Sequence, residues 1–176
     1  MLDLKFLSGS LQPTLQDRLF DPLNIVSGEP VFVRKQLCYT GHASTTYSVE
    51  QAVAIIDWIW QNTNSEDFLP YAITLVEGGE AISIAEDNGE FTCGEIVGTC
   101  LKKIAGLNIL VCVSRKTTGC FVADMLQPQK PRAVRDAATN ALKALIRELK
   151  NPTIRKKMDS QLSLESALQL SQDNLF

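Results

Sequence analysis

The sequence predicts an α/β fold, a two-layer α+β sandwich in which a mostly antiparallel sheet carries helices on one face. The order of segments reads strand, helix, strand, strand, helix, strand, strand, helix. Residues 77–80, Glu-Gly-Gly-Glu, form a tight-turn signal that joins two of these strands as a hairpin. The run NILVCVS at 108–114 is almost wholly apolar and is typical of a central strand.

The first half of the chain supplies a strand, a helix and the hairpin. Val31, Val33 and Tyr39 favour strand from position 31 onward. Ser48 followed by Gln51 forms a capping box, which predicts the start of a helix. Apolar residues then recur at helical spacing, and they predict one buried face: Val49, Ala52, Val53, Ile56, Ile59 and Trp60.

The second half supplies two more helices. The segment CGEIVGTCLKKIAG, from 93 to 106, reads as a helix with Gly106 as its stop. The segment GCFVADML, 119–126, reads as a strand. Pro131 opens a strong helix that ends before Asn151-Pro152. We therefore expect an N-terminal arm at 1–30, the folded domain at 31–150, and a basic, then amphipathic, tail at 151–176.

Composition limits the classes of function. No apolar run approaches the roughly 20 residues of a membrane helix, and the N-terminus lacks the features of a secretory signal. Five cysteines without a CxxC pair and a single histidine, His42, leave no zinc ligand set. These features favour a cytoplasmic protein without a membrane anchor, and the formal net charge of −3 argues against a dedicated nucleic-acid binder.

Two enzymatic or metal-binding interpretations are weaker than their structural alternatives. Glu86, Asp87 and Glu90 could bind a hard cation, but a solvated turn before a helix N-terminus fits them better. Cys93 near a helix start could be a nucleophile with His42 as its base. No phosphate-binding glycine motif is present. We therefore expect no catalytic residue, no metal and no cofactor.

Two surface features suggest binding. The last predicted helix carries an excess of basic residues, which could contact phosphates or an acidic protein, or form a solvated face: Arg132, Arg135, Lys143, Arg147 and Lys150. In the tail, the spacing of Leu164, Ala167 and Ser171 is similar to that of a ubiquitin-interacting helix, although the usual acidic lead-in is absent. The alternative is an amphipathic docking tail.

Four stretches in chain order resemble the ancient domain of the IMPACT/YigZ family: VRKQLCYTGHAS, EDNGEFTCG, LNILVCVSRKTTG and RAVRDAATNAL. The resemblance covers about Val31 to Lys150. The turn at the start of the second stretch is the family's recognition feature, and it comprises Glu86, Asp87, Asn88, Gly89 and Glu90. The aromatic pair and double glycine that follow Arg115 in the family are replaced here by Lys-Thr-Thr-Gly at 116–119.

The resemblance implies a fold like the second domain of ribosomal protein S5, a sheet covered by two helices on one side. It implies a standalone, diverged, non-enzymatic regulator in translation control and the stress response. The implied partner is the ribosome-associated coactivator of the general-control kinase, and RNA or the ribosome is the alternative. The candidate contact residues are Arg115, Lys116, Arg132, Arg135 and Arg147.

Overall fold

The computed structural model describes residues 24–33, 37–63, 65, 68–77, 79–89, 91–104, 107–117 and 129–150. The chain divides into one unit of Met1–Ala144 and a second of Leu145–Phe176, and the sheet described below belongs to the first. The strand predicted at 119–126 and the tail lie outside the described residues. None of the helices that are described is both long and apolar enough to cross a membrane.

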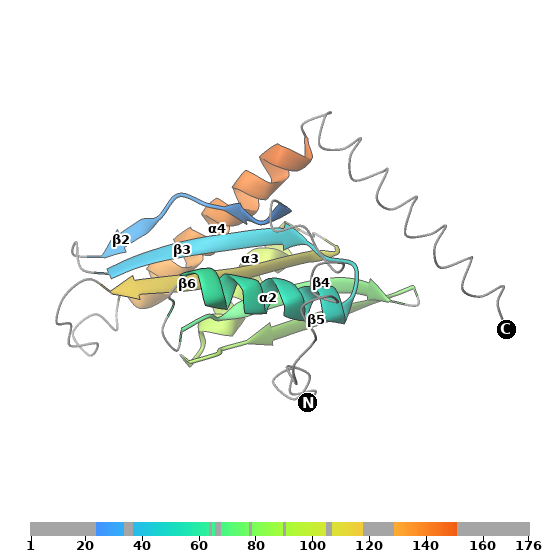
Figure 1. The fold of residues 1–176 in the computed structure, drawn as a ribbon, viewed down its shortest axis with the longest axis horizontal. Coiled ribbons are helices and arrows are strands. Elements are labelled where there is room, and N and C mark those ends of the chain that lie inside the picture. The colour runs from blue at the N-terminus through green and yellow to red at the C-terminus, as the bar shows by residue number, and fades with distance from the viewer. Residues whose placement is uncertain are drawn as a thin grey trace, which may run out of the picture. The chain divides into compact units, whose positions relative to one another are not determined.

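Six strands form one sheet in which every neighbouring pair is antiparallel (Figure 1). The order across the sheet is β1-β3-β6-β4-β5, and β2 also pairs with β3. The strands are β1 (Val26–Ser27), β2 (Val31–Val33), β3 (Leu37–Thr45), β4 (Tyr71–Glu77), β5 (Glu80–Glu86) and β6 (Ile109–Thr117). The predicted antiparallel α/β class is confirmed.

The central strand of the sheet is β6. It pairs with β3 on one side along nine residues and with β4 on the other. Residues Ile109 to Val113 are all buried, because helices cover both faces of the sheet at this point. The apolar run at 108–114 was therefore correctly read as a central strand.

Three helices pack around the sheet: α2 (Val49–Thr63), α3 (Cys93–Lys103) and α4 (Lys130–Leu149). The predicted capping box starts α2, since the Gln51 backbone N–H donates to the Ser48 hydroxyl at 3.2 Å. The Gln51 side chain accepts from the backbone N–H of Tyr47 at 2.7 Å. Pro131 lies in the first turn of α4, and α3 ends at Lys103, three residues before Gly106.

Helices α3 and α4 cover the same face of the sheet, as predicted. A methyl group added to Gly41 of β3 would lie 2.1 Å from the Ala137 carbonyl oxygen of α4. One added to Gly98 of α3 would lie 3.2 Å from the Cβ of Ala85 in β5. Both helices thus lie on the face of the sheet to which Gly41 and Ala85 belong.

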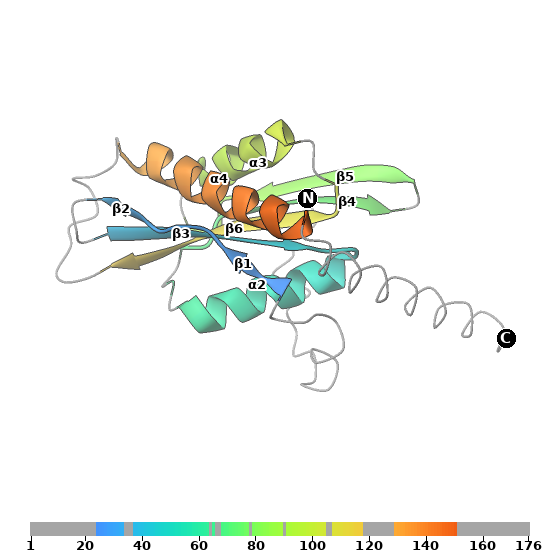
Figure 2. The ribbon, with the colours of Figure 1, turned by 90° about the horizontal axis from the view of Figure 1, so that it is seen from above.

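Helix α2 lies on the opposite face and adds a third layer to the predicted sandwich (Figure 2). Its buried side chains join a core cluster with alternate residues of β4 and β6: Ala52, Ile55, Ile59, Tyr71, Ile73, Leu75, Leu110 and Cys112. The physical reason is that β4 and β6 carry apolar residues at both odd and even positions, so both faces of the sheet must be removed from water.

The end of the predicted N-terminal arm belongs to the sheet. Strand β1 pairs Val26 with Ala43 and Ser27 with His42. The Gly28 N–H donates to the Gly41 carbonyl at 2.9 Å, and an added Cβ at Gly28 would lie 2.4 Å from the backbone nitrogen of Ala141. A strand of two residues is too short to show an alternation of apolar and polar residues in the sequence, so only its pairing with β3 identifies it.

Candidate functional site

Three basic residues of α4 before Leu145 lie on its outer side. Arg132, Arg135 and Lys143 are exposed, while the inward positions are small or apolar. The Arg132 Nε lies 3.7 Å from a carboxylate oxygen of Asp136, and the two side chains are 86% and 49% exposed. An exposed pair one helical turn apart contributes only about 0.3–0.5 kcal/mol, so this pair leaves the Arg132 guanidinium available to a ligand.

Helix α3 packs against α4 next to these basic residues. The Cys100 thiol donates to the Arg135 carbonyl and accepts from the Thr139 hydroxyl, both at 3.8 Å. Lys103, three residues after Cys100 and exposed, lies on the same side of α3. We define the basic helical face as Lys103, Arg132, Arg135 and Lys143. Sequence reasoning missed Lys103, although Lys102 and Lys103 lie in the last part of the helix predicted at 93–106.

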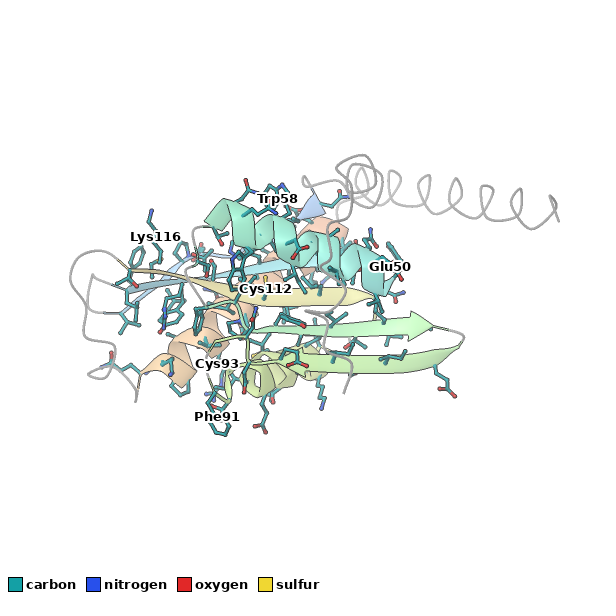
Figure 3. All side chains as sticks on the ribbon, turned by 60° about the horizontal axis from the view of Figure 1, so that its bottom comes forward. Glu50, Trp58, Phe91, Cys93, Cys112 and Lys116 are labelled. Carbon is teal, nitrogen blue, oxygen red and sulfur yellow. The ribbon has the colours of Figure 1, made fainter. Side chains whose placement is uncertain are left out.

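Arg115 and Lys116 do not form one surface, because neighbouring strand residues point to opposite faces. The Arg115 Cζ lies 4.6 Å from the centroid of the buried Phe68 ring, which meets Tyr39 edge-on. The Arg115 N–H donates to the Ser65 hydroxyl at 3.0 Å. The half-buried Arg115 thus packs onto the fold, whereas Lys116 is exposed (Figure 3).

Two further predicted features lie beyond the first unit. Arg147 is exposed on the part of α4 that belongs to the second unit, which begins at Leu145. The tail motif of Leu164, Ala167 and Ser171 lies outside the described residues. Both remain predictions, and the basic helical face is defined without them.

The acidic turn connects β5 to α3. The Asp87 carboxylate accepts the Gly94 N–H at 2.8 Å, and the Asn88 carbonyl accepts the Leu69 N–H at 3.1 Å. Asn88 and Gly89 have φ values of 33° and 107°, so both adopt left-handed conformations that suit turns. Asp87 therefore holds the start of α3, and Glu90 lies outside the described residues.

The structure does not bring Cys93 and His42 together. The His42 Nδ1 lies 2.8 Å from the Ser27 hydroxyl oxygen, and its Nε2 lies 2.8 Å from that of Ser114. Burial lowers the pKa of His42 to about 4. Cys93 is buried at the start of α3, on the other face of the sheet (Figure 3).

Cys100 and Cys112 are buried thiols, and the described acidic residues do not gather into a metal-binding site. Burial raises the pKa of the Cys112 thiol, which lies beneath α2, and Cys100 is buried between α3 and α4. Within the described part of the chain, no group of three or more His, Cys, Asp or Glu side chains converges on a point where a metal could bind. Of the predicted contact residues, Arg132 and Arg135 lie on the basic helical face, whereas Arg115 and Lys116 do not.

The comparisons with known proteins identify a fold. No protein-family model and no curated protein match the chain. A crystal structure described as that of a hypothetical protein matches 69% of this chain with a TM-score of 0.56 and 18% identity. The two-domain translational regulator Yih1 matches 81% of this chain with a TM-score of 0.48 and 20% identity. This chain covers 58% of the length of each.

Proposed function

We propose that the protein is a non-enzymatic, cytoplasmic binding module that acts in translation control and the stress response. Its basic helical face contacts an acidic surface of a protein partner. The observation that carries this proposal is the alignment of Arg132, Arg135 and Lys143 on the exposed side of α4, with α3 packed against that helix through Cys100. The resemblance of the sequence to the IMPACT/YigZ family supports the choice of a translation-regulatory coactivator as that partner.

The charge balance of the two helices supports this surface. Within α3 and the part of α4 before Leu145, the basic helical face has four basic side chains and only one acidic neighbour, Asp136, because Glu95 lies in the groove beside β5. Cations gathered on rigid helices raise the rate of encounter with an acidic partner, and they do so against the overall net charge of −3. A partner with exposed carboxylates therefore fits this face.

The alternative is RNA or the ribosome, because the same cations can contact phosphates. Single-stranded nucleic acid bound through four cations loses affinity with a log–log salt slope of roughly −3. A protein interface with apolar contacts loses affinity less steeply with salt. The net charge and the absence of a nucleic-acid motif favour the protein partner.

The test is recovery of the tagged, full-length protein from native lysate with and without RNase. Arg135→Glu is compared with Lys116→Glu, since both substitutions reverse one exposed charge but only the first lies on the basic helical face. We expect translation-regulatory proteins to stay bound after RNase and to be lost with Arg135→Glu alone.

Two outcomes contradict the proposal. If every bound component leaves with the RNA, the basic helical face is a nucleic-acid surface. If Arg135→Glu and Lys116→Glu reduce binding equally, the position of the charge on α4 is irrelevant and the basic helical face is not the contact.

A further inference from the structure

The edge strand β5 is unusually open to pairing. Among the described residues it pairs with β4 alone. Proteins normally protect such edges with charges, prolines or bulges. Here the charges Glu80 and Glu86 stand only at the two ends, and the five residues between them, Ala-Ile-Ser-Ile-Ala, include no charge and no proline.

The register of the hairpin shows which backbone groups face outward. Glu77 and Glu80 flank the two-residue turn and thus form a hydrogen-bonded pair. Hydrogen-bonded and non-hydrogen-bonded pairs alternate along an antiparallel ladder. Ala81, Ser83 and Ala85 therefore direct their N–H and C=O groups away from β4, and all three residues are exposed.

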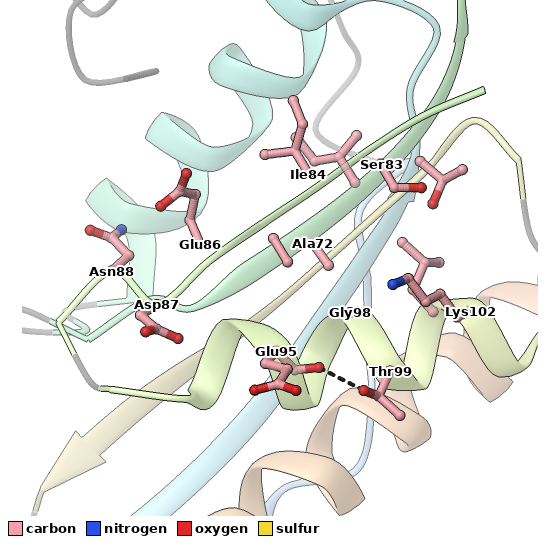
Figure 4. A pocket seen from close by; sticks show the side chains of 14 residues that line it. Ala72, Ser83, Ile84, Glu86, Asp87, Asn88, Glu95, Gly98, Thr99 and Lys102 are labelled. Atoms are coloured by element: carbon pink, nitrogen blue, oxygen red, sulfur yellow. Dashed lines mark hydrogen bonds between the residues drawn. The ribbon is translucent and has the colours of Figure 1, made fainter. Parts of the chain in front are cut away.

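A groove of about 470 Å³ runs beside Ser83 and Ala85, between β5 and α3 (Figure 4). Its floor is formed by small residues, Ala72, Ala85 and Gly98. The Cβ that Gly98 lacks would lie 3.2 Å from Ala85 and 3.9 Å from Ala72. The small residues let α3 pack closely against β4 and β5 here, so this part of the groove is narrow and admits only a small side chain.

The groove has opposite charges at its two ends. Glu86, Asp87 and Glu95 lie at the end where β5 runs into α3. Lys102 lies farther along α3, and hydroxyl groups line the groove on that side: Thr74, Ser83 and Thr99. Asp87 uses one carboxylate oxygen to hold Gly94, and its second oxygen can accept another donor.

We infer that β5 and this groove bind an extended segment of a partner protein as an additional antiparallel strand. Its backbone pairs with Ala81, Ser83 and Ala85, and alternate side chains enter the groove. Antiparallel pairing places the N-terminal part of the segment at the acidic end, because β5 runs toward that end. This interaction goes beyond the proposed function and uses a surface separate from the basic helical face.

The spacing of the groove defines the segment. Side chains on one face of a strand are separated by two residues, or about 6.8 Å. The positions of Asp87 and Ser83 are four residues apart along the chain, and the narrow floor at Ala85 and Gly98 lies between them. Because Lys102 lies on the Ser83 side of the groove, the segment carries a basic residue opposite Asp87, a small residue two positions later, and an acidic residue two positions after that.

The test is selection of binders from a displayed library of random nine-residue peptides, using the full-length protein. We expect enrichment of peptides with Lys or Arg four positions before Asp or Glu. Ser83→Pro removes an outward N–H without breaking a hydrogen bond to β4. It should lower the affinity of the protein for the selected peptides at least tenfold. Ser83→Ala, which keeps that N–H, should not. Thermal unfolding confirms that both variants fold.

A second variant tests the charges without altering the backbone. The double substitution Glu95→Lys with Lys102→Glu changes exposed side chains only, and it should weaken the preference for a basic residue four positions before an acidic one, although Glu86 and Asp87 remain. The inference is overturned if no peptide is enriched, or if Ser83→Pro and Ser83→Ala bind the peptides equally. Selection of acidic peptides that Arg135→Glu abolishes also overturns it, while supporting the basic helical face.

Discussion

His42 and Ser114 are joined by a buried hydrogen bond that assigns the tautomer of the imidazole. The Ser114 hydroxyl donates to the Thr40 carbonyl at 3.3 Å, so it accepts from the His42 Nε2–H at 2.8 Å. The Nδ1 of His42 then accepts from the Ser27 hydroxyl. Side chains of β1, β3 and β6 are thus linked through a neutral histidine, and both ring nitrogens are used within the sheet.

The buried histidine predicts a loss of stability at mildly acidic pH. Its pKa is about 4 in the folded protein, against 6.5 for an exposed histidine. The unfolded chain therefore takes up a proton first, and the free energy of unfolding falls as the pH decreases from 6.5 toward 4. Between pH 7.5 and 5.0 the loss from this group is about 2 kcal/mol.

Chemical denaturation of the wild type and of His42→Gln at these two pH values measures the effect. The glutamine does not titrate, so the pH dependence should be smaller by about that amount. Equal pH dependence in both proteins would show that His42 is protonated with its ordinary pKa in the folded state.

Ser114 should matter more than Ser27, although each lies at the same distance from the imidazole. Ser114 is 6% exposed, and Ser114→Ala leaves the buried His42 Nε2–H and the Thr40 carbonyl without this hydroxyl, which costs about 1–3 kcal/mol. Ser27 is exposed, so water replaces its hydroxyl and Ser27→Ala costs about 1 kcal/mol or less. Urea unfolding of the two variants provides the comparison, and an equal loss would contradict the assigned tautomer network.

Thr92 occupies a conformation that threonine disfavours. Its φ is 67°, in the left-handed region, and its side chain makes no capping hydrogen bond to α3. Left-handed backbone costs an L-residue other than glycine roughly 1–2 kcal/mol. Thr92→Gly should therefore raise the free energy of unfolding by about 1 kcal/mol, after the entropy that glycine adds to the unfolded chain.

Thr99→Gly is the matched control for this substitution, because Thr99 lies inside α3 and its hydroxyl bonds the Glu95 carbonyl. Glycine in a helix interior is destabilising, so this variant should unfold at a lower temperature than the wild type. If Thr92→Gly also unfolded at a lower temperature than the wild type, the left-handed backbone at Thr92 would not be a source of strain.

Two glycines of the α3–α4 face should respond differently to alanine. At Gly41 the added Cβ would overlap backbone atoms of Ala137, at 2.1 and 2.7 Å, and neither helix nor strand can shift freely. We expect Gly41→Ala to destabilise by about 3 kcal/mol or more. At Gly98 the nearest atom is the Ala85 Cβ at 3.2 Å, and alanine favours the helix by about 1 kcal/mol.

Gly98→Ala should consequently change thermal stability little while it narrows the groove beside β5. Gly98→Ala should also lower the affinity for the peptides selected from the library. Weaker binding by a variant of unchanged stability would show that the added methyl group acts on the groove and not through unfolding. A similar, small change in stability for Gly41→Ala would contradict the close approach of β3 and α4.

Local patterns were sufficient for most of the elements. The capping box at Ser48 and Gln51 starts α2, and the apolar run at 108–114 is β6. The hairpin turn at 77–80 and the helix opened by Pro131 are also present. These features depend on neighbours within a few residues, so the sequence displays them directly. Strand β1 was not predicted, because two residues show no periodicity and are held by their partners on β3.

By itself, the sequence determined which segments are helices and strands, that the sheet is antiparallel, and that α4 carries excess basic charge. The tertiary structure alone decided that α2 covers the face opposite α3, that Arg115 packs onto Phe68, and that α3 meets α4 at Cys100. The reason is physical: periodicity specifies which side of an element is apolar. Only long-range packing selects the surface that side meets, and therefore which exposed charges become neighbours.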